Sequence, residues 1–128
     1  MTRRSIYIKG FAHSNPIPAA CQIGDLLVSV IITGVDPGSG KMPSTMDEQC
    51  AFMFQHIRAV VEAGGCNIQD IAKITIWLAD RSDRRAVNHE WLSMFPDPDD
   101  RPARQTMETK LNDGKLVQCD FLAARQTR

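Results

Sequence analysis

The sequence predicts an α+β fold in which two helices cover one face of a single mixed sheet of six strands. Two observations support this prediction. Strand-like and helical patterns follow one another in the order β-β-β-α-β-α-β-β, and both helical segments have one apolar side. The chain has 128 residues and no internal repeat or linker, which predicts one domain over residues 1–128.

Three strands are expected before the first helix, at residues 5–9, 19–23 and 26–33. Gly24 and Asp25 form a tight turn that pairs the second strand with the third. The third strand is nearly all apolar and rich in β-branched residues, which is typical of a central strand covered on both faces.

The first helix is expected at residues 46–63. Thr45 and Glu48 have the spacing of a capping box at its start, and two glycines follow its last residue. Gln49 and His56 fall mostly on the side away from the apolar stripe, so we expect His56 in solvent.

A short helical turn is expected at residues 68–71, and the second helix at residues 84–95 with Asp83 as its cap. The remaining strands are expected at residues 72–79, 105–111 and 116–123. An Asp-Gly turn between the last two predicts that they form a hairpin.

In the last strand, Gln118 and Asp120 point away from the apolar, helix-covered side. This outer face is of mixed polarity, which is typical of a face that meets other subunits around a cleft. The pattern therefore predicts a closed homo-oligomer.

Arg104 is the most informative candidate for binding a ligand. It follows a loop at residues 95–100 whose two prolines and three acids exclude helix, and it stands where this loop becomes a strand. An arginine on such a support can bind a carboxylate through two parallel hydrogen bonds. The alternative is a solvated arginine paired with an acid of the loop. Strand parity predicts that Arg104 shares the face of Gln118 and Asp120.

Composition limits the partners of the protein. Lys+Arg and Asp+Glu are both 15, and the resulting zero net charge argues against a nucleic-acid partner, since phosphate binding needs a basic surface. No apolar run has the length of a signal peptide or membrane span, so we expect a cytoplasmic protein without a membrane partner. The four cysteines and three histidines lack metal-ligand spacing, so we expect reduced thiols and no metal.

Five motifs follow one another along the chain: Asp36-Pro37-x-x-Gly40-x-x-Pro43, Val60-Val61-Glu62-Ala63-Gly64-Gly65, Asp70-Ile71-Ala72-Lys73-Ile74-Thr75-Ile76-Trp77-Leu78-Ala79-Asp80, Val87-Asn88-x-x-Trp91 with Phe95, and Pro102-Ala103-Arg104. In this order they resemble the motifs of the RidA/YjgF family of small reactive-imine deaminases, and the resemblance covers nearly the whole chain from about residue 16. The motifs are specific together, although no single one is specific alone.

The resemblance implies a chorismate-mutase-like fold and a homotrimer with three clefts between subunits. It implies hydrolysis of enamines and imines, such as 2-iminopropanoate, to a 2-oxo acid and ammonia, without a metal or cofactor. In that chemistry the arginine that matches Arg104 binds the substrate carboxylate, and water attacks the imine carbon.

Four residues depart from the family pattern. Ile17 stands where typical deaminases of the family carry a tyrosine, and Val30 and Ile31 stand where they carry serine and glycine. Gln118 replaces a water-positioning glutamate; its amide can still hold a water but cannot act as a base near neutral pH. The resemblance therefore implies a divergent member with an altered, more apolar pocket.

Four further residues are candidates for the missing polar roles. Asp120 is either a base or water holder, or an acid of the interface. His13 belongs to the residue type that most often transfers protons and lies in a loop expected near the cleft, although a lone loop histidine more often has no such role. Asn88 forms a side-chain hydrogen bond either with the main chain near the cleft or with a neighbouring residue of its own helix. Thr106 lies two residues after Arg104 in the same strand, so the two side chains are expected on the same face of the sheet.

Three functions stay open. The first is a deaminase of carboxylate-bearing imines or enamines, including larger ones such as an aminomuconate, with Arg104, Gln118 and Asp120 as its catalytic residues. The second is a non-catalytic, regulatory binder of small carboxylates, which would keep the arginine and lose the other polar groups. The third is the ribonuclease or translation-inhibitor role of some relatives, which ranks last because no basic stripe with interleaved aromatics is present.

Overall fold

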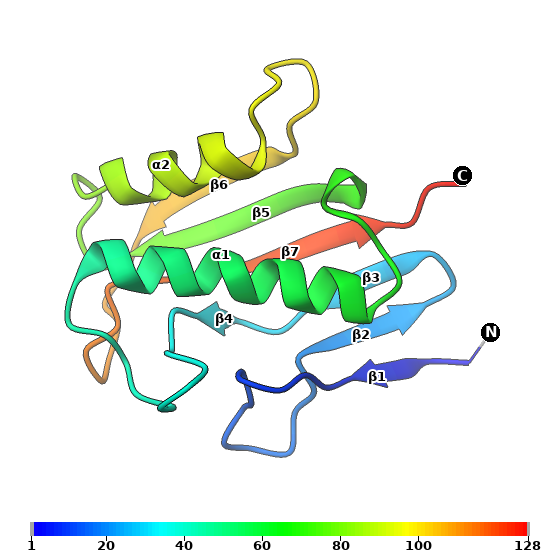
Figure 1. The fold of residues 1–128 in the computed structure, drawn as a ribbon, viewed down its shortest axis with the longest axis horizontal. Coiled ribbons are helices and arrows are strands. Elements are labelled where there is room, and N and C mark those ends of the chain that lie inside the picture. The colour runs from blue at the N-terminus through cyan, green and yellow to red at the C-terminus, as the bar shows by residue number, and fades with distance from the viewer. Residues whose placement is uncertain (1, 128) are drawn as a thin grey trace.

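The computed structural model describes residues 2–127 and contains one seven-stranded sheet with strand order β1-β2-β3-β7-β5-β6, in which β4 also pairs with β7. The strands are β1 (Arg4–Ile6), β2 (Ala20–Ile23), β3 (Leu26–Ser29), β4 (Ile32–Thr33), β5 (Ile71–Leu78), β6 (Ala103–Glu108) and β7 (Val117–Ala124). Helices α1 (Met46–Ala63) and α2 (Arg85–Met94) lie on the same face of the sheet, and a 3-10 turn, η1 (Ile68–Asp70), precedes β5 (Figure 1). The predicted α+β class with two helices on one face is confirmed, with seven strands in place of six.

The additional strand arises because the apolar run at residues 26–33 forms two strands. β3 pairs with the second half of β7, and β4 pairs with its beginning. Between them the Ser29 hydroxyl accepts a hydrogen bond from the Phe121 N–H at 2.8 Å and donates one to the Val30 carbonyl oxygen at 2.8 Å. The side chain thus takes the place of a main-chain acceptor, and the ladder is interrupted at residues 30–31.

The predicted hairpin of the last two strands is wrong, because β5 lies between them. β5 pairs with β6 in parallel and with β7 in antiparallel orientation. Main-chain hydrogen bonds from Thr109 to Leu78 and from Ala79 to Leu116 carry the connection around the end of β5. The Asp-Gly signal therefore marks a turn correctly but does not determine which strands become neighbours.

The caps predicted for the ends of the helices are found for α1 but not for α2. At the start of α1 the Thr45 hydroxyl accepts the Glu48 N–H at 3.2 Å, as the capping box predicts. After α1, Gly65 has a φ of 73°, which favours glycine. α2 differs, because Arg84 rather than Asp83 occupies its cap position and no side chain caps the helix. None of the helices within residues 2–127 combines the length and the apolar character needed to cross a membrane.

The core lies between the helices and the inner face of the sheet. Its sheet side consists of alternate residues of β5 and β7, which are buried beneath the helices. Two thiols belong to this core. Burial raises the pKa of Cys50 to about 12 and that of Cys119 well above its ordinary value, so neither thiol ionises near neutral pH.

Gln49 is buried, with 0% of its surface exposed, on the side of α1 that the sequence pattern marks as polar. The side chain forms hydrogen bonds with three main-chain groups in two loops, one before α1 and one before β7. Its Nε2 donates to the Pro43 and Gly114 carbonyl oxygens at 2.7 and 3.0 Å, and its Oε1 accepts from the Leu116 N–H at 2.9 Å. These two loops cover the polar side of α1, and Gln49 provides hydrogen-bond partners for the main-chain groups that become buried there.

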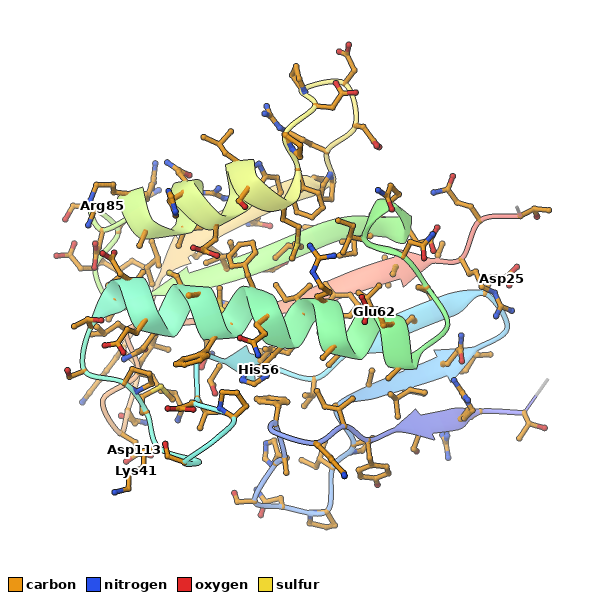
Figure 2. The ribbon with its side chains drawn as sticks, viewed as in Figure 1. Asp25, Lys41, His56, Glu62, Arg85 and Asp113 are labelled. Carbon is orange, nitrogen blue, oxygen red and sulfur yellow. The ribbon has the colours of Figure 1, made fainter. Side chains whose placement is uncertain are left out.

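His56, which was expected in solvent, is also buried, with 2% of its surface exposed. It lies below α1 beside the segment that follows β4 (Figure 2). Its Nε2 is 2.7 Å from the Val35 carbonyl oxygen, and its ring packs against Phe11 with the centroids 5.2 Å apart. Burial lowers the pKa of His56, and the hydrogen bond to Val35 opposes this effect in part.

We expect folding stability to decrease on acidification because of His56. The unfolded chain binds a proton near the ordinary pKa of 6.5, whereas the folded chain binds it less tightly, so unfolding takes up a proton below that pH. The contribution is complete above pH 6.5 and is lost as the pH falls toward the lower pKa of the folded state. The slope is at most about 1.4 kcal/mol per pH unit. Urea unfolding of the wild type and of His56→Gln, which keeps a donor without titrating, measures it. Equal slopes in the two proteins would contradict the prediction.

Gly34, directly after β4, has no room for a side chain, because a Cβ there would overlap the main chain of Gln49 in α1. We expect Gly34→Ala to lower the free energy of unfolding by about 1–3 kcal/mol, since the strand and helix would have to separate. The matched control is Gly38→Ala, where the nearest atom would be the Asp36 carboxylate at 3.4 Å. Denaturant midpoints of the two variants test this, and a loss of the same size in both would count against it.

Candidate functional site

Arg104 lies on the helix-covered face of β6, which is an edge strand of the sheet. Its guanidinium carbon is 5.2 Å from the centroid of the Trp91 ring in α2, and its Nε donates to the Thr106 hydroxyl at 2.9 Å. These two contacts fix the side chain without using its terminal Nη groups. The terminal groups therefore stand at the edge of the sheet, oriented and able to bind a planar anion.

The positive charge of Arg104 is not balanced by a neighbouring acid. None of the ion pairs within residues 2–127 includes it, so a pair with an acid of the 95–100 loop finds no support there. Burial, and then the nearby charge of Arg84, lower the pKa of Arg104. An anion bound at Arg104 would offset both effects, which favours a ligand carboxylate at this position.

Asn88 belongs to the same part of the molecule. Helical spacing puts Arg84, Asn88 and Trp91 on one side of α2, and the two outer residues both interact with Arg104. The Asn88 residue between them is exposed to solvent. The structure therefore joins Arg104 to Thr106 and places Asn88 on the side of α2 that carries Trp91.

Gln118 and Asp120 lie on the opposite, outer face of the sheet, so the prediction that they share a face with Arg104 is wrong. Asp120 pairs in β5 with Thr75, whereas Arg104 pairs with the preceding residue, Ile74, which is buried beneath the helices. The alternation of side chains along β6 and along β7 does not show which residues of the two strands point to the same face. That depends on the register with which each strand pairs with β5, which lies between them.

Gln118 lines a cavity of about 460 Å³ between the loop at residues 11–14, β4 and the start of β7. His13, Ile31 and Lys115 line it as well. The Nδ1 of His13 accepts the N–H of Asn15 at 3.1 Å, which leaves its Nε2 as a donor. The structure thus brings three predicted residues together and adds Lys115. Lys115 was not predicted from the sequence, because it is the last residue of a turn and no local signal indicates that its side chain lines a cavity.

The other predicted residues lie outside this cavity. Asp120 is half-buried on the outer face; burial raises its pKa, and the charge of Lys73 opposes this effect in part. Val30 is half-buried and packs against the core, and Ile17 is exposed in the loop before β2. Of the three apolar residues predicted to line the pocket, only Ile31 therefore does so within one chain.

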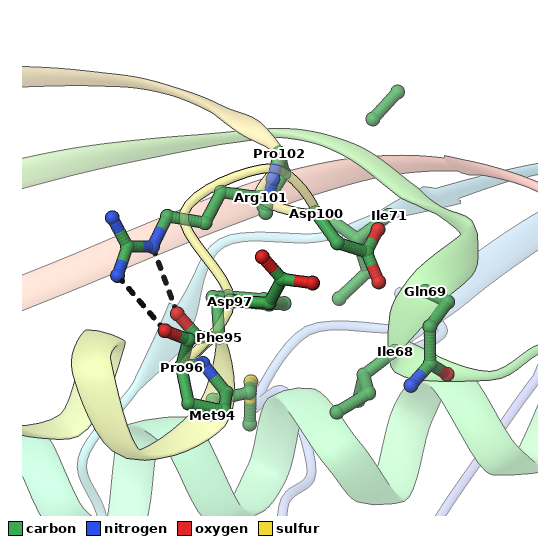
Figure 3. A pocket seen from close by; sticks show the side chains of 11 residues that line it. Ile68, Gln69, Ile71, Met94, Phe95, Pro96, Asp97, Asp100, Arg101 and Pro102 are labelled. Atoms are coloured by element: carbon green, nitrogen blue, oxygen red, sulfur yellow. Dashed lines mark hydrogen bonds between the residues drawn. The ribbon is translucent and has the colours of Figure 1, made fainter.

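A second cavity, of about 320 Å³, lies between η1 and the loop at residues 95–102 (Figure 3). The Nε and Nη2 of Arg101 donate to the carbonyl oxygens of Phe95 and Pro96 at 2.8 and 3.3 Å. Arg101 is thus the arginine that fastens this acidic loop. None of the predicted site residues lines the cavity.

The outer face of the sheet exposes apolar side chains from β2, β3 and β7. They are Ile23, Leu26, Val28 and Leu122, with 41–45% of their surface exposed. Ile23 pairs with Leu26, and Val28 pairs with Leu122, so they form one apolar patch. A continuous patch of this kind is typical of a surface that another protein molecule covers.

A single chain thus carries two half-sites on opposite faces of its sheet: the arginine of the edge strand, and the cavity at Gln118. Within residues 2–127 no three His, Cys, Asp or Glu side chains gather in a way that could bind a metal ion. The fold and these residues define a class, that of small α+β proteins with an arginine on the edge strand that forms no ion pair within residues 2–127.

The family model described as Endoribonuclease L-PSP matches residues 7–124. The chain belongs to this family, which is the RidA/YjgF family that the motifs resemble.

Two relatives illustrate the range of the family. A RutC family protein of Haemophilus influenzae is 28% identical over 102 residues, which are 78% of each chain. The 2-iminobutanoate/2-iminopropanoate deaminase of Escherichia coli K12 is 25% identical over 117 residues, which are 90% of this chain and 91% of the relative. The chain therefore has an enzyme of imine chemistry among its relatives, at low identity.

Solved structures agree with the fold. The structure of the YjgF gene product of Escherichia coli aligns with a TM-score of 0.87 and 24% identity, over 96% of this chain and 99% of the other. A probable translation initiation inhibitor from Rhodopseudomonas palustris aligns with a TM-score of 0.89 and 22% identity, over 98% of this chain and 100% of the other. At these identities the likeness concerns the fold alone.

Proposed function

We propose that the protein is a hydrolytic deaminase of imines or enamines that carry a carboxylate, and that it releases a 2-oxo acid and ammonia. The observation behind this proposal is the guanidinium of Arg104, which has no acidic partner among residues 2–127 and is oriented by Trp91 and Thr106. Its two Nη groups bind the substrate carboxylate through parallel hydrogen bonds. The deaminase of Escherichia coli, at 25% identity, supports this class of substrate.

The reaction adds one water across the C=N bond. The oxygen of a water held by the Gln118 amide forms a bond to the imine carbon, and one proton of that water passes to the imine nitrogen. In the resulting carbinolamine the hydroxyl proton moves to the nitrogen, the C–N bond breaks, and ammonia leaves a C=O group behind. An enamine first takes up a proton on carbon and loses one from nitrogen, which converts it into the imine.

Asp120 is our candidate for the proton transfers. It lies on the same face as Gln118, two residues along β7, and a carboxyl group at this place can give and take a proton. Burial raises its pKa, and the charge of Lys73 opposes this effect in part. The Gln118 amide cannot carry a proton in this way. His13, which lines the cavity beside Gln118, is the second candidate.

We propose further that the site is completed between copies in a homotrimer. A small substrate cannot contact Arg104 and Gln118 of one chain, because they lie on opposite faces of the sheet. If the apolar patch of one copy packs against the next, the edge strand β6 of that neighbour can meet the cavity at Gln118. The patch of Ile23, Leu26, Val28 and Leu122 supports this arrangement.

The test is ammonia release from 2-iminopropanoate generated in the assay. The wild type is expected to exceed buffer, and Arg104→Ala to fall close to it. If neither protein exceeds buffer, hydrolysis of small imines is rejected.

A non-catalytic binder of small carboxylates is the second candidate. It is favoured by the apolar Ile31 in the cavity and by Gln118, which cannot act as a base. Such a protein would be stabilised against heat by 2-oxo acids in proportion to their affinity, and would release no ammonia from imines. Turnover above buffer that depends on Arg104 would exclude it.

A further inference from the structure

The cavity at Gln118 is built to receive a negative charge. Its polar side chains come from His13, Ser14, Thr33, Lys115 and Gln118, and none of the carboxylates of residues 2–127 lines it. All five can donate hydrogen bonds, and the imidazole does so through Nε2 because its Nδ1 accepts from Asn15. A cavity that is rich in donors, carries a cation and has no acid selects an anionic group.

The main chain is fixed by hydrogen bonds at the residue before Lys115 and at the residue after it. The Gln49 side chain, which is fully buried, binds the carbonyl oxygen of Gly114 at 3.0 Å and the N–H of Leu116 at 2.9 Å. The main chain on either side of Lys115 is thereby tied to α1. The lysine side chain is only 28% exposed, which is low for a residue in a turn between strands.

The charge of Lys115 is only weakly compensated. Among residues 2–127 it pairs with the carboxylate of Asp113, which is 3.9 Å away and belongs to a side chain that is 88% exposed. Ion pairs of this kind contribute little in water, so a ligand carboxylate can replace Asp113 at little cost. Lys115 therefore provides an ordered cation at the cavity, on the opposite face of the sheet from Arg104.

We infer that Lys115 binds a second acidic group of the substrate, so that the preferred substrates are imines or enamines with two carboxylates. The inference rests on the proposed function, in which Arg104 of a neighbouring copy binds the first carboxylate. The Nζ of Lys115 and the Nε2–H of His13 receive the second carboxylate, while the Gln118 amide stays beside the reacting carbon. Gln49 acts as a positioning residue, because it reaches the ligand only through Lys115.

The experiment measures binding and turnover separately. Isothermal titration compares 2-oxoglutarate, with two carboxylates, and 2-oxobutanoate, with one. The wild type is expected to bind 2-oxoglutarate about tenfold more tightly, and Lys115→Gln to abolish this preference, because one charge-assisted contact has that magnitude. Lys110→Gln, an exposed lysine of the same connection, is the matched control and keeps the preference. Unchanged thermal unfolding of the variants confirms that they fold.

Two results would overturn the inference: equal affinity of the wild type for the two acids, or a preference that survives in Lys115→Gln. The proposed function fails in a different way, when the imines of both acids are hydrolysed no faster than in buffer. Because the titrations need no turnover, they report on Lys115 even then. If Gln49→Leu folds and loses the preference while it still binds 2-oxobutanoate, the positioning role of Gln49 is supported; an unchanged preference in that variant would refute it.

Discussion

Arg104→Ala is expected to lower kcat/KM for a carboxylate-bearing imine by about a hundredfold or more, since it removes a charged, two-point contact with the substrate. The carboxylate is not the group that reacts, so the loss should appear more in KM than in kcat. Arg104→Lys keeps the charge but not the paired hydrogen bonds or the contact with Trp91, and should fall between the wild type and the alanine variant.

The matched control for Arg104 is Arg85→Ala. Arg85 lies at the start of α2 and forms a 3.4 Å pair with Asp47, with 79% and 67% of the two side chains exposed, so its loss should leave activity and stability nearly unchanged. Steady-state kinetics at several ionic strengths compare the variants. Equal losses in Arg104→Ala and Arg85→Ala would show that general positive charge, and not the position of Arg104, matters.

Val28→Asp is expected to dissociate the proposed homotrimer and to abolish activity, although Val28 lies on the outer face and far from Arg104 in the sequence. The variant places a charge in the middle of the apolar patch beside Leu122, where association would bury it without a partner. Sedimentation equilibrium gives the mass, and circular dichroism shows whether the monomer stays folded. A folded monomer with full activity would contradict assembly of the site between copies.

Mixed trimers provide a sharper test of the divided site. Arg104→Ala removes one half-site, and Ile31→Trp fills the cavity of the other, so each variant alone should be inactive. If a cleft takes Arg104 from one copy and the cavity from the next, about one cleft in four of a randomly mixed trimer regains both intact halves. Unfolding and refolding the two variants together should therefore restore roughly a quarter of the activity. A site contained in a single chain would give none.

The sequence predicts the helices and most strands well, because their signals are local. The capping box at Thr45 and the apolar stripe of α1 depend on residues within a few turns of one another. The same holds for the Gly24-Asp25 hairpin between β2 and β3. Each of these features is decided by neighbours along the chain.

The sequence-based predictions are wrong where the structure of a segment depends on residues that are far away in the chain. The apolar run at residues 26–33 carries no sign that the Ser29 hydroxyl will bond to Phe121, 92 residues away, and divide the strand. His56 falls on the polar side of its helix, and only the segment after β4 turns that side into interior. The face of Arg104 likewise depends on β5, which inserts between strands that local signals would pair. Periodicity within one element cannot supply such information.

The interruption at Ser29 also separates the residue that holds the strands from the residue that lines the cavity. The N–H of Val30 bonds to the Ala19 carbonyl oxygen, and its own carbonyl accepts from the Ser29 hydroxyl, so the main chain at this point is satisfied whatever side chain residue 30 carries. Ser29 bonds to Phe121 and packs into the sheet, Val30 packs against the core, and only Ile31 lines the cavity at Gln118. Because Ile31 lies outside the ladder, its side chain can change the shape of the cavity while the hydrogen bonds between the strands stay as they are.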